Sequence, residues 1–74
     1  MAAITAAQQR EHFPVVLRRL RADRGYTQAQ LAARCGLACA TIESWEQGRR
    51  TPKWPQIVTL ASALGVSTEA FRAR

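Results

Sequence analysis

The sequence predicts an all-α fold of five helices in one small domain. Three observations predict it: apolar residues recur at helical spacing, a glycine follows each of four such segments, and no stretch alternates polar and apolar residues as a strand does. The 74 residues are well below the ~150 that serve as a soft prior for one domain. The chain is therefore too short for a two-domain enzyme, and 14 alanines leave it a core of modest size.

The first helix is expected over residues 14–24, with Pro14 in its first turn, where a missing amide hydrogen is tolerated. Residues 1–12 are rich in Ala and Gln and are expected to form a flexible or frayed N-terminal arm, which leaves residues 13–74 as the domain. The buried face of the first helix follows the i, i+3, i+4, i+7 pattern: Phe13, Val16, Leu17 and Leu20.

The second helix is expected to begin at Thr27, because Gln30 three residues later completes a capping box. Gly36 ends it, and a third helix over residues 38–47 follows after a short turn. At 100° per residue, the large apolar residues of the third helix, Ile42 and Trp45, share one side and are expected in the core. The other side carries only small or polar side chains: Ala40, Glu43, Ser44 and Gln47.

A fourth helix is expected over residues 54–64, followed by a short fifth helix that Ser67 caps and that ends near Phe71. The fourth helix buries the residues at i, i+3, i+4 and i+7 from Ile57. Trp54 at its start fits two alternatives, packing on this helix or exposure at an interface, and the sequence does not separate them.

Positive charge is concentrated in the middle of the chain. The formal net charge is +6 and ten of the eleven cations are Arg, whose guanidinium group matches phosphate with two parallel hydrogen bonds. Residues 18–53 hold eight cations and three anions, so this segment accounts for five of the six net charges. A pI near 11.1 in a small domain is typical of a protein that binds a polyanion, most often nucleic acid.

The second and third helices, joined by a tight glycine turn and followed by a basic loop, are typical of a helix-turn-helix. Over residues 17–71 the chain resembles the phage repressor and Cro-type helix-turn-helix family, the lambda repressor-like DNA-binding domains. The resemblance rests on an ordered set: Arg21, the run from Thr27 to Ala32, Gly36, Ile42, the run from Trp45 to Gly48, Pro52, and the run from Leu60 to Ser67. It implies a five-helix bundle whose third helix enters the major groove while the second lies across the DNA backbone.

The family's functional positions fall on matching residues of this chain. Base-reading positions fall on Cys39, Ala40, Glu43 and Ser44, and phosphate-positioning ones on Thr27, Gln28 and Gln47. Charge adds three loop residues to the phosphate-positioning set: Arg49, Arg50 and Lys53. Arg21 and Glu46 match a pair that forms a structural salt bridge in the family.

Three positions depart from the family pattern. Ala38 stands where a capping Ser is usual, and Cys39 and Ser44 stand where long polar residues are usual. These short side chains cannot make the paired hydrogen bonds to guanine or adenine that discriminate bases most strongly. The departures predict that Cys39 and Ala40 contact thymine methyl groups, that Glu43 accepts from a cytosine amine, and that phosphates supply much of the affinity.

Other functions find little support in the sequence. Cys35 and Cys39 are too few for a disulfide framework or a four-ligand zinc site, and His12 has no second partner, so we expect no metal and no cofactor. A disulfide between the two cysteines and oxidation of an exposed Cys39 remain alternatives. Neither a catalytic motif nor a phosphate-cradling glycine loop is present, and we expect no enzyme.

The sequence as a whole predicts a cytoplasmic, sequence-specific DNA-binding regulator, a repressor that places residues 38–47 in the major groove. We expect a homodimer on double-stranded DNA, because one module of this size buries too little DNA surface to bind tightly. The alternative is an antitoxin or adaptor that uses the same scaffold to bind a toxin or another protein. The sequence contains no apolar run long enough to span a membrane, and we expect no membrane partner.

Overall fold

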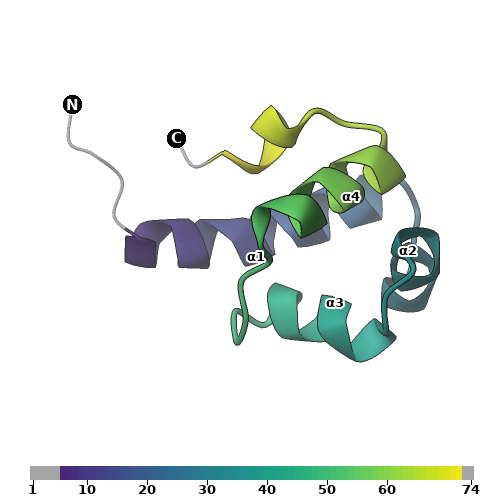
Figure 1. The fold of residues 1–74 in the computed structure, drawn as a ribbon, viewed down its shortest axis with the longest axis horizontal. Helices are drawn as coiled ribbons and strands as arrows, with labels where there is room; N and C mark the ends of the chain where they lie inside the picture. Colours follow the sequence, from purple (N-terminus) through teal and green to yellow (C-terminus); the bar gives the residue numbers. More distant parts are fainter. Residues whose placement is uncertain (1–5, 73–74) are drawn as a thin grey trace.

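The computed structural model describes residues 6–72, with side chains from residue 12 onward. Within that range every regular element is a helix, as predicted (Figure 1). The elements are α1 (Ala6–Asp23), α2 (Gln28–Cys35), α3 (Cys39–Glu46), α4 (Trp54–Leu64) and the 3₁₀ helix η1 (Thr68–Phe71). The fifth helix is therefore a single 3₁₀ turn and not an α-helix. Four residues suffice only for bonds of the i to i+3 type, such as that from the Ala70 amide to the Ser67 carbonyl at 3.0 Å.

One core holds the helices together. Its fully buried members are five aliphatic side chains, Leu17, Leu31, Ile42, Leu60 and Leu64. The predicted faces of α1 and α4 supply most of the core, and Trp45 is buried beside Ile42, as the periodicity predicts. The ring centroids of Phe13 and Phe71 lie 5.4 Å apart, and this aromatic contact packs η1 against α1.

The start of α1 is the main error of the sequence prediction. The helix begins at Ala6 and continues through Pro14, which was expected in the first turn. A proline inside a helix removes one backbone hydrogen bond. Here the Pro14 ring is buried, and its Cγ lies 3.6 Å from where a Cβ of Gly48 would stand, so packing against the turn after α3 offsets that loss. Residues 1–5 of the predicted arm lie outside the described residues, and the domain boundary at residue 13 stays a prediction.

The ends of α2 agree with the predicted capping signals. The Gln30 amide donates to Thr27 Oγ1 at 3.0 Å, and the Thr27 amide donates to Gln30 Oε1 at 2.8 Å, which completes the capping box. Gly36 then adopts φ of 68°, a left-handed conformation that other residues rarely take, so the chain reverses into α3 within three residues.

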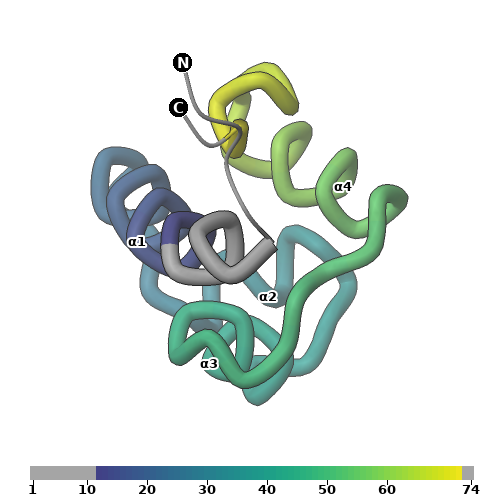
Figure 2. The backbone as a smooth tube through the Cα atoms, turned by 90° about the vertical axis from the view of Figure 1, so that its left-hand side faces the viewer, coloured from purple at the N-terminus to yellow at the C-terminus, as the bar shows by residue number. Residues whose placement is uncertain are grey.

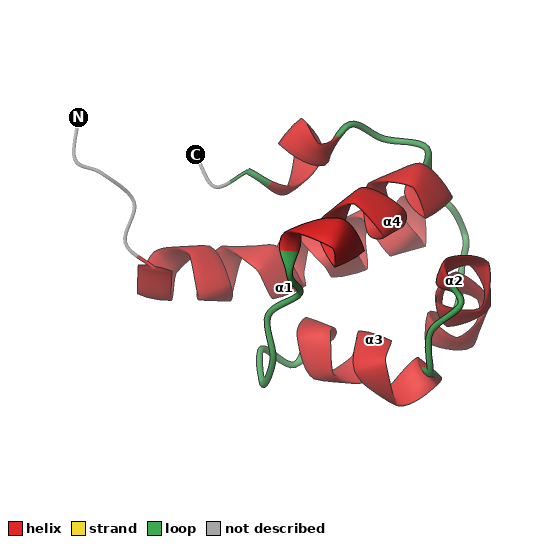
Figure 3. Ribbon diagram, viewed as in Figure 1, coloured by secondary structure: helices red, strands yellow, loops and turns green. Residues whose placement is uncertain are grey.

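The arrangement leaves α3 at the edge of the molecule. α3 packs on α2 and α1, whereas η1 packs on α4 and α1. The end-on tube view places α3 and η1 on opposite sides, with α1 and α4 between them (Figure 2). The connection from α3 to α4, residues 47–53, leads from the end of α3 across to the start of α4 (Figure 3).

Candidate nucleic-acid interface

The polar side of α3 faces solvent. Ala40, Glu43 and Gln47 are exposed and Ser44 is half-buried, whereas Ile42 and Trp45 on the other side have 0% and 2% exposure. The helix is therefore anchored by two large apolar side chains and turns small or polar ones outward. A helix with this profile is suited to lie close against a surface such as a DNA groove, because no bulky residue holds it away.

Cys39 departs from its expected place on that face. Its side chain is half-buried and packs against the core, and its Sγ lies 3.9 Å from Glu43 Oε1, a long contact for a thiol donor. The outward surface at this position is thus smaller than the helical angle alone suggests. The assignment of Cys39, Ala40, Glu43 and Ser44 to base reading stays a prediction.

The N-terminus of α2 brings Thr27 and Gln28 to the surface beside α3. The Thr27 hydroxyl oxygen already accepts from the Gln30 amide in the capping box. A further contact from this residue would therefore use the hydroxyl hydrogen as a donor. Gln28 is half-buried, and its Nε2 donates to Glu46 Oε1 at 3.1 Å, an interaction that links the start of α2 to the end of α3. Sequence reasoning missed this bond, because nothing in the spacing of the two residues signals it.

Glu46 is a buried charged residue, with only 3% of its surface exposed. Arg21 Nε donates to Glu46 Oε2 at 2.6 Å and Arg21 Nη2 donates to Oε1 at 3.0 Å, so the guanidinium binds both carboxylate oxygens. This hydrogen-bonded contact raises the pKa of Arg21 above its ordinary value, and burial opposes it. Because Gln28 also donates to Glu46, the ion pair that joins α1 to α3 positions a residue of the candidate interface as well.

The basic loop after α3 is exposed along its length. Arg49, Arg50 and Lys53 are exposed, and within the described part of the chain their side chains make no hydrogen bond or ion pair. A hollow of about 450 Å³ separates this loop from α3 and is lined by seven residues: Leu37, Thr41, Trp45, Arg50, Thr51, Lys53 and Gln56. Thr41 is a polar residue of this surface that sequence reasoning did not single out, since its helical angle places it next to Trp45.

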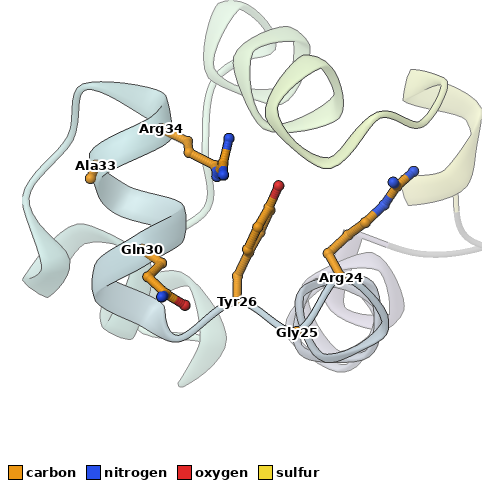
Figure 4. Close-up of a pocket in the computed structure, with 6 residues that line it drawn as sticks. All are labelled: Arg24, Gly25, Tyr26, Gln30, Ala33 and Arg34. Atoms are coloured by element: carbon orange, nitrogen blue, oxygen red, sulfur yellow. The ribbon is translucent and has the colours of Figure 1, made fainter.

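Two further arginines of the middle segment, Arg34 and Arg24, are engaged within the fold. The Arg34 guanidinium lies over the Tyr26 ring, 4.6 Å from its centroid, and Arg24 Nη2 donates to the Gly65 carbonyl at 3.2 Å (Figure 4). These residues line a shallow groove of about 500 Å³ between the end of α1 and α2. Gly65 follows the last residue of α4, so Arg24 stands at the opposite end of that helix from the basic loop.

The titratable side chains described by the structure give no sign of a metal site or a disulfide. Within the described residues, no group of three His, Cys, Asp or Glu side chains could hold a metal ion. Cys35 and Cys39 are both free thiols, and burial raises the pKa of Cys35, which keeps it in the less reactive protonated form. None of the helices within residues 6–72 combines the length and apolarity needed to span a bilayer.

Comparison with known proteins agrees with this arrangement. Residues 13–74 match the sequence model of a family described as a helix-turn-helix domain. A curated relative, the uncharacterized HTH-type transcriptional regulator y4dJ of Sinorhizobium fredii, is 45% identical over 49 residues. The aligned segment covers 66% of this chain and 64% of the relative, so the chain spans slightly less than two thirds of that protein's length.

Two solved structures share the fold. A transcriptional regulator of the HTH_3 family from Vibrio cholerae superposes with a TM-score of 0.84 at 27% identity, over 90% of this chain and 38% of that one. The restriction-modification controller protein C.AhdI from Aeromonas hydrophila superposes with a TM-score of 0.80 at 31% identity, over 82% of this chain and 92% of that one. The resemblance inferred from the motifs is therefore matched by the three-dimensional fold.

Proposed function

This chain belongs to the helix-turn-helix domain family, and on that premise we propose that it is a sequence-specific DNA-binding transcriptional regulator that acts as a repressor. In this proposal α3 enters the major groove of double-stranded DNA and presents its base-reading residues, Cys39, Ala40, Glu43 and Ser44. The observation that carries the proposal is the position of two neighbouring surfaces. The exposed face of α3 has no large apolar side chain, and it lies next to a loop whose cations have no partner in the described residues.

The phosphate contacts come from both ends of the helix-turn-helix. Gln28 uses one amide hydrogen on Glu46 and retains a second hydrogen and its carbonyl oxygen, so it can donate to a phosphate without leaving its position. Exposed cations of the loop add charge that does not depend on base sequence. The full set of proposed contacts is Thr27, Gln28, Gln47, Arg49, Arg50 and Lys53.

The active unit in this proposal is a homodimer on a two-fold symmetric operator in the cytoplasm. One small module buries too little DNA surface for tight binding, and two copies double the phosphate and base contacts. One solved relative of similar length, C.AhdI, is described as a restriction-modification controller protein, which is compatible with a regulator of this size.

The test is duplex affinity measured by fluorescence anisotropy over a range of salt concentrations. The logarithm of the affinity should fall with the logarithm of salt by about 0.9 per phosphate neutralised. Removing Arg49 and Arg50 together should therefore flatten the slope by about 1.8 for each protomer bound, or about 3.6 for the proposed homodimer. The matched control replaces Arg24 and Arg34 by Ala. It lowers the net charge by the same two units but leaves the loop intact, and its slope should stay near that of the wild type.

Equal loss in the two double variants would show that net charge alone drives binding and would contradict the proposed interface. Absence of binding to any duplex would overturn the proposed function. The second candidate, an antitoxin or adaptor that binds a toxin or another protein, would then be favoured, because α4 exposes an aromatic residue on an uncharged face.

A further inference from the structure

The groove between the end of α1 and α2 combines two cations with an aromatic side chain. Its volume is about 500 Å³, which lies within the range of small-molecule sites, and its lining contains no carboxylate. The cations are the exposed Arg24 and Arg34, which lie on either side of Tyr26 (Figure 4). None of these residues belongs to the DNA contacts proposed for α3 and the basic loop.

Contacts within the fold hold both guanidinium groups of the groove in position. Arg24 Nη2 donates to the Gly65 carbonyl at 3.2 Å, and a glycine permits this approach, because a Cβ at position 65 would stand 2.8 Å from the same nitrogen. The Cζ atom of Arg34 lies 4.6 Å from the centroid of the Tyr26 ring. Arg21 Nη1 donates to the Tyr26 carbonyl at 2.9 Å and so fixes the backbone that carries this ring. Groups positioned in this way lose less conformational entropy when a ligand binds.

The same side chains retain hydrogen-bond donors that no described residue uses. Arg24 keeps its Nη1 and Nε hydrogens, and Arg34 keeps all of its N–H groups, because its contact with Tyr26 is through the ring face. The Tyr26 hydroxyl makes no hydrogen bond to a described residue. Gln30 Oε1 accepts from the Thr27 amide at 2.8 Å, so the side-chain nitrogen of Gln30 is left to donate. A groove of donors and cations is suited to a ligand with negative charge and several acceptor oxygens.

We propose that this groove, formed by Arg24, Tyr26, Gln30 and Arg34, binds a small phosphate monoester. A monoester phosphate carries a charge of about −1.5 to −2 at neutral pH and has three acceptor oxygens, so one group can accept from both arginines and from the Tyr26 hydroxyl. The organic part of the ligand then lies along α2, over the Ala33 methyl group, which belongs to the same lining.

The arrangement of charge favours a small ligand over a strand of DNA. Each DNA phosphate is a diester with one negative charge, whereas the groove offers two guanidinium groups to one ligand. Arg24 stands at the Gly65 end of α4, and the basic loop precedes the other end of that helix, which is about 16 Å long for its 11 residues. The groove is therefore a second cationic surface, apart from the one proposed for DNA.

An NMR titration of the isotope-labelled protein without DNA tests the site. The probe is adenosine 5′-monophosphate, and its control is adenosine, which lacks the phosphate; the ionic strength is held constant so that screening does not change. The monophosphate should shift the amide resonances of residues 24–34 in a saturable manner, inorganic phosphate should shift the same resonances more weakly, and adenosine should leave them in place. Equal shifts with adenosine, or shifts confined to residues 49–53, overturn the proposal.

Two double variants separate the groove from the net charge of the chain. Replacing Arg24 and Arg34 by Ala should abolish the saturable shifts, and replacing either one should raise the Kd of the monophosphate about tenfold. The matched control replaces Arg49 and Arg50 by Ala, which removes the same two charges but leaves the groove intact, so its Kd should stay within about twofold of the wild type. Equal weakening in both double variants overturns the proposal.

Tyr26→Phe is a milder variant that leaves the ring beneath Arg34 in place. It removes only the hydroxyl donor and should raise the Kd about fivefold, as the loss of one hydrogen bond does. Circular dichroism checks that each variant keeps the helix content of the wild type. An unchanged Kd in a folded Tyr26→Phe variant contradicts the place given to the phosphate.

Phosphate diesters distinguish a ligand site from a further contact with the DNA backbone. Dimethyl phosphate should bind the groove at least about tenfold more weakly than the monoester, because it has less charge and fewer free oxygens. Equal affinity for the diester, or a duplex that shifts the groove resonances as the monophosphate does, overturns the proposal and assigns the groove to DNA. If the monophosphate binds the groove while no duplex is bound anywhere, the proposed function fails and the ligand site stands.

Discussion

Glu46 shows how a single residue joins the stability of this domain to its candidate interface. Its carboxylate is buried, and three donors satisfy it: two from Arg21 and one from Gln28. A buried charge is tolerated only when it is paired and hydrogen-bonded, so these donors are a condition of the fold. The same arrangement fixes Gln28 at the start of α2, where the proposed phosphate contact lies.

We expect Arg21→Ala to destabilise the domain by about 3–5 kcal/mol, because it leaves the Glu46 carboxylate buried without its cation. Urea unfolding followed by circular dichroism measures the effect. Arg19→Ala removes an exposed arginine two residues away on the same helix, and its free energy of unfolding should stay within about 0.5 kcal/mol of the wild type. A small effect of Arg21→Ala would mean that the pair is not a structural requirement.

Ala40 tests the division between base reading and phosphate contact. It is exposed on the outward face of α3, so Ala40→Leu should leave the fold intact while adding bulk where the helix meets the groove. We expect affinity for the preferred operator, identified by selection from a random duplex pool, to fall more than affinity for random DNA. A loss that is equal for both kinds of duplex would contradict the assignment of Ala40 to base reading.

At the scale of the element, the two helices of the helix-turn-helix begin differently. Thr27 caps α2 with both bonds of a capping box, whereas α3 begins after Ala38 with no side-chain cap. The first amides of α3 therefore lack the hydrogen bonds that a Ser or Thr hydroxyl supplies at a helix start. The short helix depends instead on the burial of Ile42 and Trp45.

Ala38→Ser should consequently stabilise the domain, and Thr27→Ala should destabilise it, each by about 0.5–2 kcal/mol. The backbone of Ala38 is already extended, with φ of −73° and ψ of 145°, so a serine there is positioned to accept from the α3 amides. Urea midpoints of the two variants, read against the wild type, measure both changes. No gain from Ala38→Ser would indicate that packing alone fixes the start of α3.

The helix ends were predictable wherever a local signal determines them. The capping box fixed the start of α2, Gly36 fixed its end, and periodicity located α4 over its full length. The start of α1 was not predictable in the same way. Pro14 is accommodated inside the helix because its ring packs against the turn at Gly48, which lies 34 positions further along the chain. Tertiary packing of this kind leaves no mark in local sequence.

At the scale of the whole molecule, the count of positive charges indicates a nucleic-acid-binding protein better than it indicates which residues bind. The sequence placed five of the six net charges in residues 18–53, but the fold engages several of these cations internally. Arg21 binds Glu46, Arg24 binds a carbonyl at the end of α4, and Arg34 lies over Tyr26. Which arginines are engaged depends on contacts between distant segments, so only the structure distinguishes Arg21, Arg24 and Arg34 from the exposed cations of the loop.

DNA should act on the stability of the entire domain, because a ligand that binds only the folded state stabilises it by mass action. At a duplex concentration about 100 times the dissociation constant, the gain is about 2.7 kcal/mol. For a domain of this size that corresponds to a rise in Tm of about 10–20 °C. Thermal unfolding in low salt, with and without duplex, measures this rise in Tm.

The Arg49 and Arg50 double alanine variant should show a smaller rise in Tm at the same duplex concentration, whereas the Arg24 and Arg34 control should keep most of the wild-type rise. A Tm that does not change with duplex would mean that DNA binds the folded domain no better than the unfolded chain, which is equally basic. That result would contradict an interface that depends on the fold.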